Sequence, residues 1–370
     1  MLKELFWNIL FDYIKGKHST GQIFNLGRYF FGRKKSILTW EPIYLSIFLT
    51  YRCNLRCDMC LTHSNNNRSQ YGQKPTKDID FELFKEVLNK YKNALVVNLI
   101  GNGEPLLHKD LFRMIEYAAD TMKMYTFSVS NGILLGEYLD KLVASPLTHL
   151  TVSLNGHNPS EFNRMTGMDQ RFFTSACENT RMLIRERNIE KSNLEVWVSI
   201  ILDQENYRYL NEMIRFAESL GADGVVFGQF LPTEKEGFTA DERCLFSDNH
   251  DVLRAFRDAK SIKPKLKILL PPLLERAKVN KSCSVYFYNL SVDGEGNVGG
   301  CCCQLLDLSG NGKISAQSPW NNEHFREIRR RFLEPTCNIT DPCKYCYNNL
   351  PAKASSFRSL ARNLFRRSNL

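Results

Sequence analysis

A regular alternation of strand-like and helix-like segments is the feature that most constrains this fold. Apolar runs typical of buried strands lie at residues 43–50, 95–100, 124–130, 148–154, 194–202 and 223–230. Amphipathic segments typical of helices lie at 80–92, 109–122, 134–144, 172–188, 206–220 and 248–260. Successive strand–helix units predict a parallel sheet, which right-handed crossovers curl into an open barrel. The predicted fold class is α/β: a partial (βα)6 TIM-like barrel followed by a small cysteine-rich cluster-binding domain.

The alternation ends near residue 265, and this predicts four parts of the chain. Residues 1–42 are a basic and apolar extension, residues 43–265 the barrel, residues 266–350 the cysteine-rich domain, and residues 351–370 a basic tail. Glycine-rich turns and clustered cysteines follow residue 265. A small domain held by metal needs little hydrophobic core.

The net charge of +9 lies entirely at the two ends, as +4 in residues 1–42 and +5 in residues 352–370. A nucleic-acid-binding protein would spread lysine and arginine over a working face, so no nucleic-acid partner is expected. No apolar run approaches the ~18 residues of a membrane span. Glu4 and Asp12 interrupt the apolar N-terminus, and no small-residue cleavage site follows, so we expect a cytoplasmic protein.

The C-terminal tail has the pattern of a basic amphipathic helix. Apolar residues recur at 357, 360, 361, 364 and 365 with arginines between them. This pattern suits peripheral contact with an anionic membrane at its inner face, and equally a helix docked on the barrel. In the first case a lipid-linked saccharide becomes a natural substrate.

Three of the twelve cysteines, Cys53, Cys57 and Cys60, directly follow the first predicted strand. In a chain without an export signal, this clustering favours metal ligation over disulfides. Three thiolates can hold three irons of a [4Fe-4S] cluster and leave the fourth iron open for another ligand. Zinc is the alternative, but its structural sites usually take four protein ligands.

This spacing on this loop resembles the radical S-adenosylmethionine (SAM) superfamily, and the resemblance extends from residue 43 to about 235. It implies a [4Fe-4S] cluster whose open iron binds SAM. Asn102, Gly103, Glu104 and Pro105 stand where the family has a Gly-Gly-Glu-Pro motif that contacts the SAM amino group, with Asn102 in place of the usual glycine. The resemblance also implies SAM contacts by Met59 at the adenine, by strand-end polar groups, and by an arginine at the carboxylate: Ser130, Asn131, Ser153, Asn155 and Arg164.

The resemblance also implies the reaction. A flavodoxin or ferredoxin-type reductant supplies an electron through the cluster, the C5′–S bond of SAM breaks, and a 5′-deoxyadenosyl radical abstracts hydrogen from a substrate. The barrel would exclude water and orient one C–H bond.

A second group of cysteines predicts an auxiliary cluster. Cys283 and Cys301 precede the pair Cys343 and Cys346. The pattern resembles the SPASM and shortened Twitch domains of radical SAM enzymes over residues 283–346, and fits the single-cluster Twitch form better. Four protein ligands leave no iron open, so this [4Fe-4S] cluster would carry an electron. Zinc is again the alternative. Three more cysteines are inert, alternate ligands or part of a second site: Cys302, Cys303 and Cys337.

The main functional expectation is a radical oxidoreductase that oxidises a carbohydrate, cyclitol or glycan precursor, with the auxiliary cluster as electron acceptor. Gln229 and Tyr288 are neutral hydrogen-bonding groups that could dock a polyol. Fewer residues precede the barrel than a leader-peptide domain needs. The alternatives are a peptide-modifying maturase, an epimerase in which the thiol of Cys244 returns a hydrogen atom, and a zinc-stabilised binding module.

Overall fold

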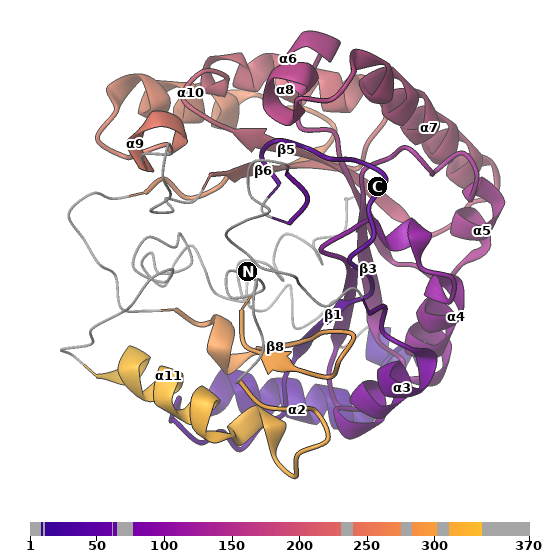
Figure 1. Ribbon diagram of the computed structural model, residues 1–370, viewed down its shortest axis with the longest axis vertical. Coiled ribbons are helices and arrows are strands. Elements are labelled where there is room, and N and C mark those ends of the chain that lie inside the picture. Colours follow the sequence, from indigo (N-terminus) through magenta and orange to yellow (C-terminus); the bar gives the residue numbers. More distant parts are fainter. Residues whose placement is uncertain are drawn as a thin grey trace.

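The computed structural model describes residues 9, 12–60, 62–64, 77–230, 240–274, 283–301 and 311–334. Within these residues one nine-stranded sheet has the order β7-β6-β5-β4-β3-β2-β1-β8-β9. Neighbouring strands are parallel except β8 and β9. The sheet is curved and most of the helices run along its outer side (Figure 1). The predicted α/β partial barrel is confirmed.

The six predicted strands all form, each one or two residues shorter at its ends. They are β1 (Tyr44–Phe48), β2 (Val96–Ile100), β3 (Tyr125–Ser130), β4 (His149–Ser153), β5 (Glu195–Leu202) and β6 (Gly224–Gln229). Because they are parallel and in register, their carboxyl ends meet at one edge of the sheet.

The predicted helices form α3 (Phe81–Lys90), α4 (Leu111–Glu116), α5 (Leu139–Ala144), α7 (Gln170–Ile189), α8 (Leu210–Ser219) and α10 (His250–Ser261). The helix predicted at 109–122 changes after α4 into the π-helical turn η3 (Tyr117–Thr121). Short 3-10 turns precede α4 and α8, at η2 (Pro105–Leu107) and η4 (Tyr207–Tyr209).

The helix α6 (Pro159–Thr166), between β4 and α7, was not predicted. It begins at the cap Asn158, whose side chain accepts from the Glu161 N–H, and ends at Gly167, whose φ is 67°. This helix has only eight residues, and the apolar periodicity of so short a segment is weaker than that of the twenty-residue α7 that follows it. The four-residue α9 (Ala240–Arg243) lies before α10.

The sheet continues beyond the predicted end of the barrel near residue 265. β7 (Lys267–Leu269) pairs with β6, β8 (Asn289–Val292) pairs with β1, and β9 (Val298–Gly299) pairs with β8. Strands of two to four residues carry too little periodicity to be recognised in a sequence. The division into four domains stays a prediction.

The N-terminal segment packs at the amino-terminal edge of the sheet. Its helix α2 (Thr20–Phe31) begins with a capping box formed by Ser19 and Gln22. The Gln22 carboxamide donates to the carbonyls of Ala94 and Met122, which lie just before β2 and β3. α2 therefore lies on the opposite side of the barrel from the strands' carboxyl ends.

Near α2 lies α11 (Glu323–Leu333), preceded by the turns η5 (Val285–Phe287) and η7 (Pro319–Asn321). The Trp320 indole donates to the Trp40 carbonyl, and the Trp40 indole donates to the Phe287 carbonyl. These bonds attach α11 and β8 to the segment that links α2 to the barrel. No helix among the described residues has the length and apolar character needed to cross a membrane.

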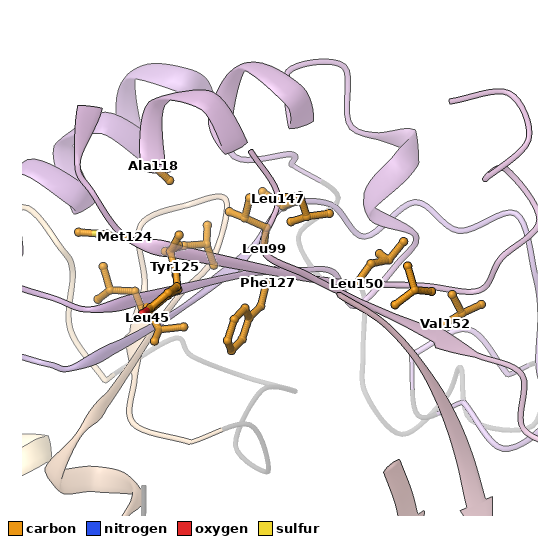
Figure 2. Close-up of a cluster of buried hydrophobic side chains, with 14 of the residues drawn as sticks. Leu45, Leu99, Ala118, Met124, Tyr125, Phe127, Leu147, Leu150 and Val152 are labelled. Atoms are coloured by element: carbon orange, nitrogen blue, oxygen red, sulfur yellow. The ribbon is translucent and has the colours of Figure 1, made fainter. Parts of the chain in front are cut away.

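Apolar side chains fill the space between the sheet and its helices, as Figure 2 shows for Leu99, Leu147 and Leu150. Phe127 points to the other face, away from the helices. Its ring contacts Tyr44 and His149, and the His149 ring contacts Trp197. These side chains lie toward the strands' amino-terminal halves, which leaves the polar strand-end residues at the other edge for chemistry.

Candidate functional site

The candidate site lies where β1 to β5 end. The cysteine loop follows β1, the Asn102–Pro105 segment follows β2, Ser130 ends β3, and Ser153 ends β4. The parallel register brings these loops to one edge of the sheet. This is the edge at which parallel α/β folds bind ligands.

Cys53, Cys57 and Cys60 are unbridged and half-buried. A backbone bond of 2.9 Å from the Cys60 N–H to the Cys57 carbonyl closes the turn between them. Met59 is half-buried on the same turn. The loop is also tied to the end of α6, because the Asp58 N–H donates to the Thr166 carbonyl at 2.8 Å.

Burial and mutual repulsion govern the ionisation of these thiols. Burial, and then the neighbouring sulfurs of Cys60 and Cys53, raise the pKa of Cys57 to about 12. Burial also raises the pKa of Cys53. Three thiolates at such positions need a compensating positive charge, which iron ions supply.

His63 distinguishes Cys60 from the other two cysteines. Burial acts to raise the pKa of Cys60, but hydrogen bonds from the His63 side chain and from nearby backbone N–H groups outweigh it and the pKa is lowered. The His63 N–H lies 3.3 Å from the Cys60 sulfur, and its ring Nε2 lies 2.6 Å from the Tyr51 carbonyl oxygen.

The Asn102–Pro105 segment packs directly on the cysteine loop. The Gly103 N–H donates to the Thr50 carbonyl at 3.0 Å, and the Glu104 N–H to the Arg52 carbonyl at 2.8 Å. A Cβ on Gly103 would overlap the Arg52 carbonyl, so only glycine fits there. Within the described part of the chain, the buried Asn102 Nδ2 has no hydrogen-bond partner.

Glu104 is 2% exposed and acts as a connector. Its Oε1 accepts from the Leu106 N–H at 3.2 Å and its Oε2 from the Asn131 N–H at 2.8 Å. Burial raises the pKa of Glu104, against the opposing effect of these bonds and one with Ser130. Pro105 is buried and begins η2.

Asn131 joins three of the loops. Its N–H binds Glu104, and its side-chain amide donates to the Asn54 Oδ1 at 2.7 Å, within the cysteine loop. Ser130 is buried, and its hydroxyl oxygen accepts from the Gly132 N–H at 3.1 Å. The structure thus brings together the cysteines, Glu104, Ser130 and Asn131.

Ser153 and Asn155 end β4 at the same edge. Asn155 has a φ of 52°, in the left-handed region that asparagine tolerates better than most residues. Its N–H donates to the Ser199 carbonyl at 3.2 Å. Asn155 is buried and Ser153 half-buried.

Arg164 is directed at carboxylates. Its guanidinium binds Glu161 at 2.8 and 3.0 Å and Asp203 at 3.0 Å through two nitrogens. Asp203, 1% exposed by its side chain, also accepts from Arg243. Burial would raise the pKa of Asp203, but the two arginines lower it. The predicted contact between Arg164 and a SAM carboxylate stays a prediction, and it requires the guanidinium to share these partners.

Two residues predicted to meet the substrate have partners inside the protein. The Gln229 side chain donates to the Pro272 carbonyl and accepts from the Leu245 N–H. The Cys244 sulfur, 3.4 Å from the Phe230 carbonyl oxygen, lies in a small buried cluster with Phe246. Catalytic roles for Gln229 and Cys244 stay predictions.

In the predicted second site, Cys283 and Cys301 are buried, before η5 and after β9. Tyr288 is also buried. Cys302, Cys303, Cys337, Cys343 and Cys346 lie outside the described residues, as does the tail 351–370.

Sequence reasoning missed Asn54, His63, Asp203 and Arg243. Asp203 directly follows β5, as Asn131 follows β3, so the strand-end rule could have found it. The other three carry no pattern of their own in the sequence.

The residues fit an iron–sulfur cluster and SAM by their chemistry. The donors are three half-buried thiols beside an unpartnered amide and a buried carboxylate. Among the described residues, no group of three or more His, Cys, Asp or Glu is arranged to hold a single metal ion. The fit therefore rests on the donor set.

Residues 47–217 match the family model described as Radical SAM superfamily. The chain is 26% identical over 198 residues to the tungsten-containing aldehyde ferredoxin oxidoreductase cofactor-modifying protein of Pyrococcus furiosus, covering 52% of this chain and 53% of that protein. It is 25% identical to the mycofactocin maturase MftC of Mycolicibacterium smegmatis, covering 49% and 43%. The chain thus spans about half the length of these relatives. A match at 25% identity to the AdoMet-dependent heme synthase of Methanosarcina barkeri covers 84% of this chain and 91% of that protein.

Solved structures share the fold. SuiB of Streptococcus suis superposes with a TM-score of 0.60 at 15% identity, over 84% of this chain and 71% of that one. anSMEcpe with bound AdoMet superposes with a TM-score of 0.57 at 14% identity, over 88% and 96%.

Proposed function

The chain belongs to the radical SAM superfamily through its domain at residues 47–217, and from this membership we propose that it is a maturase that modifies a peptide. It is an enzyme that uses a [4Fe-4S] cluster and SAM, and SPASM-type relatives carry auxiliary clusters in addition. Together, the cluster and SAM supply an oxidant able to take a hydrogen atom from an unactivated C–H bond.

The chain's own residues would hold and shield these groups. Cys53, Cys57 and Cys60 would ligate the cluster, and the unpartnered Asn102 amide would donate to an acceptor atom of SAM. Glu104 and Asn131 would keep the two loops at a constant separation through the bonds described above.

A peptide substrate is supported mainly by the kind of protein that this chain resembles over most of its length. SuiB has been solved with its precursor peptide SuiA, and anSMEcpe with a bound peptide. These two structures cover 83% and 88% of this chain. Sequence relatives include MftC and the PqqA peptide cyclase of Granulibacter bethesdensis.

The saccharide or cyclitol reading is the weaker candidate. It relied in part on the expectation that Gln229, with Tyr288, could dock a polyol, and both ends of the Gln229 carboxamide bind backbone groups of the protein. The peptide proposal covers three outcomes of the reaction: dehydrogenation, epimerisation and crosslinking. It also includes a flavodoxin or ferredoxin-type reductant and the auxiliary cluster as electron acceptor.

A second candidate substrate is a heme precursor. The heme synthase match covers nearly the whole of both chains, unlike the half-length matches to the maturases. A tetrapyrrole would add a strong absorbance band on binding, which a peptide would not.

The test is co-expression with each short open reading frame that flanks the gene, followed by mass spectrometry of the peptides. A mass change in one peptide is expected, and it should disappear in the variant Cys53→Ala/Cys57→Ala/Cys60→Ala. The same variant should lose about four of about eight irons after anaerobic reconstitution and make no 5′-deoxyadenosine under dithionite. Unchanged peptides, together with conversion of a nucleotide sugar or a heme precursor, would overturn the peptide proposal while leaving the enzyme class intact.

A further inference from the structure

We propose that the outward face of helix α2 is a docking surface for an anionic lipid membrane. The inward face is already used. Leu26 and Tyr29 belong to the hydrophobic core, and the Gln22 and Asn25 side chains bind backbone carbonyls of the barrel. The proposal concerns the side of α2 that points away from these contacts.

Large apolar side chains stand out from that side. Phe24 is 69% exposed and Phe31 is 91% exposed. They are seven residues apart, two helical turns, so they project from the same face of α2. Ile14 before the helix and Ile37 after it are also exposed. Exposure of this size is costly in water and is typical of a surface that meets a partner.

Within the described segment 12–42, the exposed charged side chains are all basic. Lys15, Lys17, Arg28, Arg33, Lys34 and Lys35 are exposed. The two acidic residues of this segment are not exposed: Asp12 accepts from the Tyr125 hydroxyl and pairs with Lys17 at 3.3 Å, and Glu41 binds Asn93. Exposed phenylalanines among predominantly basic exposed side chains match a bilayer surface, whose headgroups are anionic and whose interior is apolar.

Charge also decides between a membrane and a second copy of this chain. A symmetric dimer through this face would bring two sets of basic side chains together, and like charges would repel. An anionic surface instead gains attraction from each lysine and arginine.

Helix α7 provides an internal comparison. Met182 is 47% exposed and Ile189 is 57% exposed, again seven residues apart. The exposed Arg181 and Arg185 lie near them, but acidic Glu178 on the helix and Glu190 at its C-cap are also exposed. α7 therefore has the apolar pair without the predominantly basic surroundings, and we expect it not to bind lipid.

Docking through α2 would orient the enzyme. α2 contacts the residues just before β2 and β3, whereas the cysteine loop lies after β1 at the other edge of the sheet. The candidate site would face away from the bilayer. The inference is independent of the proposed substrate, because it depends on α2 alone.

The test uses the full-length chain and vesicles of phosphatidylcholine with or without an equal part of phosphatidylglycerol. Co-sedimentation is expected with the anionic vesicles only, and about 0.5 M salt should reverse it. Phe24→Ser/Phe31→Ser should weaken binding about tenfold or more. Arg28→Gln/Arg33→Gln should weaken it about fivefold per charge. The matched variants on α7, Met182→Ser/Ile189→Ser and Arg181→Gln/Arg185→Gln, should bind as the wild type does.

A second measurement reports insertion directly. Phe31→Trp should add fluorescence that anionic vesicles shift to shorter wavelength and that brominated lipid quenches, whereas Ile189→Trp should show neither effect. Equal binding by wild type and Phe24→Ser/Phe31→Ser, with the variant's thermal unfolding unchanged, would overturn the proposal. It would also fail if wild-type protein ignored the vesicles and sedimented as a dimer that Phe24→Ser/Phe31→Ser dissociates.

Discussion

The side-chain amide of Asn131 donates a hydrogen bond of 2.7 Å to the Oδ1 of Asn54, although 77 residues separate them in sequence. This bond connects the end of β3 to the middle of the cysteine loop. Because the Asn131 N–H also binds Glu104, this one residue connects its own loop to two other loops of the candidate site. We therefore expect the position of the cysteine loop to depend on Asn131.

Asn131→Ala should therefore disturb the cysteine loop more than it disturbs the fold. We expect a loss of about 0.5–1.5 kcal/mol in the free energy of unfolding. We also expect the electron paramagnetic resonance spectrum of the reduced cluster in the presence of SAM to differ clearly between this variant and the wild type. Asn179→Ala is the matched control, since Asn179 donates to the carbonyls of Gly132 and Ile133 and does not bind the cysteine loop. Identical spectra for the two variants would contradict the connecting role.

Glu104→Gln should destabilise the protein, because a carboxamide cannot replace both carboxylate oxygens. Two backbone N–H groups donate to Glu104, and in the variant one of them would face an NH2 group. The expected cost is about 1–3 kcal/mol in urea unfolding. Glu82→Gln on α3, where the side chain is 78% exposed, should cost almost nothing. Equal unfolding midpoints for the two variants would exclude the connecting role of Glu104.

Substitution of alanine for glycine at two positions should change the stability of the protein in opposite directions. Gly103→Ala would push the cysteine loop away from the Asn102–Pro105 segment, so we expect less iron per chain and lower stability. Gly27→Ala on α2 meets no atom within 4 Å and should stabilise the protein by about 0.5–1 kcal/mol through helix propensity. Thermal unfolding and iron analysis check both, and a neutral Gly103→Ala would refute the close packing.

Glu195 should make stability depend on pH at the amino-terminal edge of the sheet. Burial would raise the pKa of Glu195, but the neighbouring His149 ring, 3.9 Å away, and the charge of Lys267 lower it from 4.5 to about 2. A lowered carboxyl pKa contributes stability above the unfolded value of 4.5, and this contribution is lost as the pH falls from there toward 2.

Glu195→Gln should accordingly be less stable than wild type at about pH 6, with the difference shrinking toward about pH 4. Urea unfolding at both pH values measures this, and Glu82→Gln again serves as the control. A difference that grew on acidification would have the wrong sign for a lowered pKa.

The sequence by itself determined the strands of the barrel and the loops on which its chemistry lies. Apolar runs such as 95–100 and 194–202 are long enough to show their periodicity, and the cysteine spacing is local to one loop. The resemblance to the radical SAM superfamily then implied that Glu104, Ser130 and Asn131 lie near the cysteines, in agreement with the carboxyl-end rule for parallel sheets.

Only the tertiary structure decided what each polar side chain binds. Gln229 and Arg164 are of residue types that often bind ligands. In the structure, however, the Gln229 side chain binds backbone groups of Pro272 and Leu245. The Arg164 guanidinium binds the carboxylates of Glu161 and Asp203. Likewise the sequence shows that the N-terminal segment is basic and apolar, but only packing separates the buried Leu26 and Tyr29 from the exposed Phe24 and Phe31. The physical reason is that hydrogen bonds and burial depend on partners distant in sequence, whereas periodicity and motif spacing are local properties.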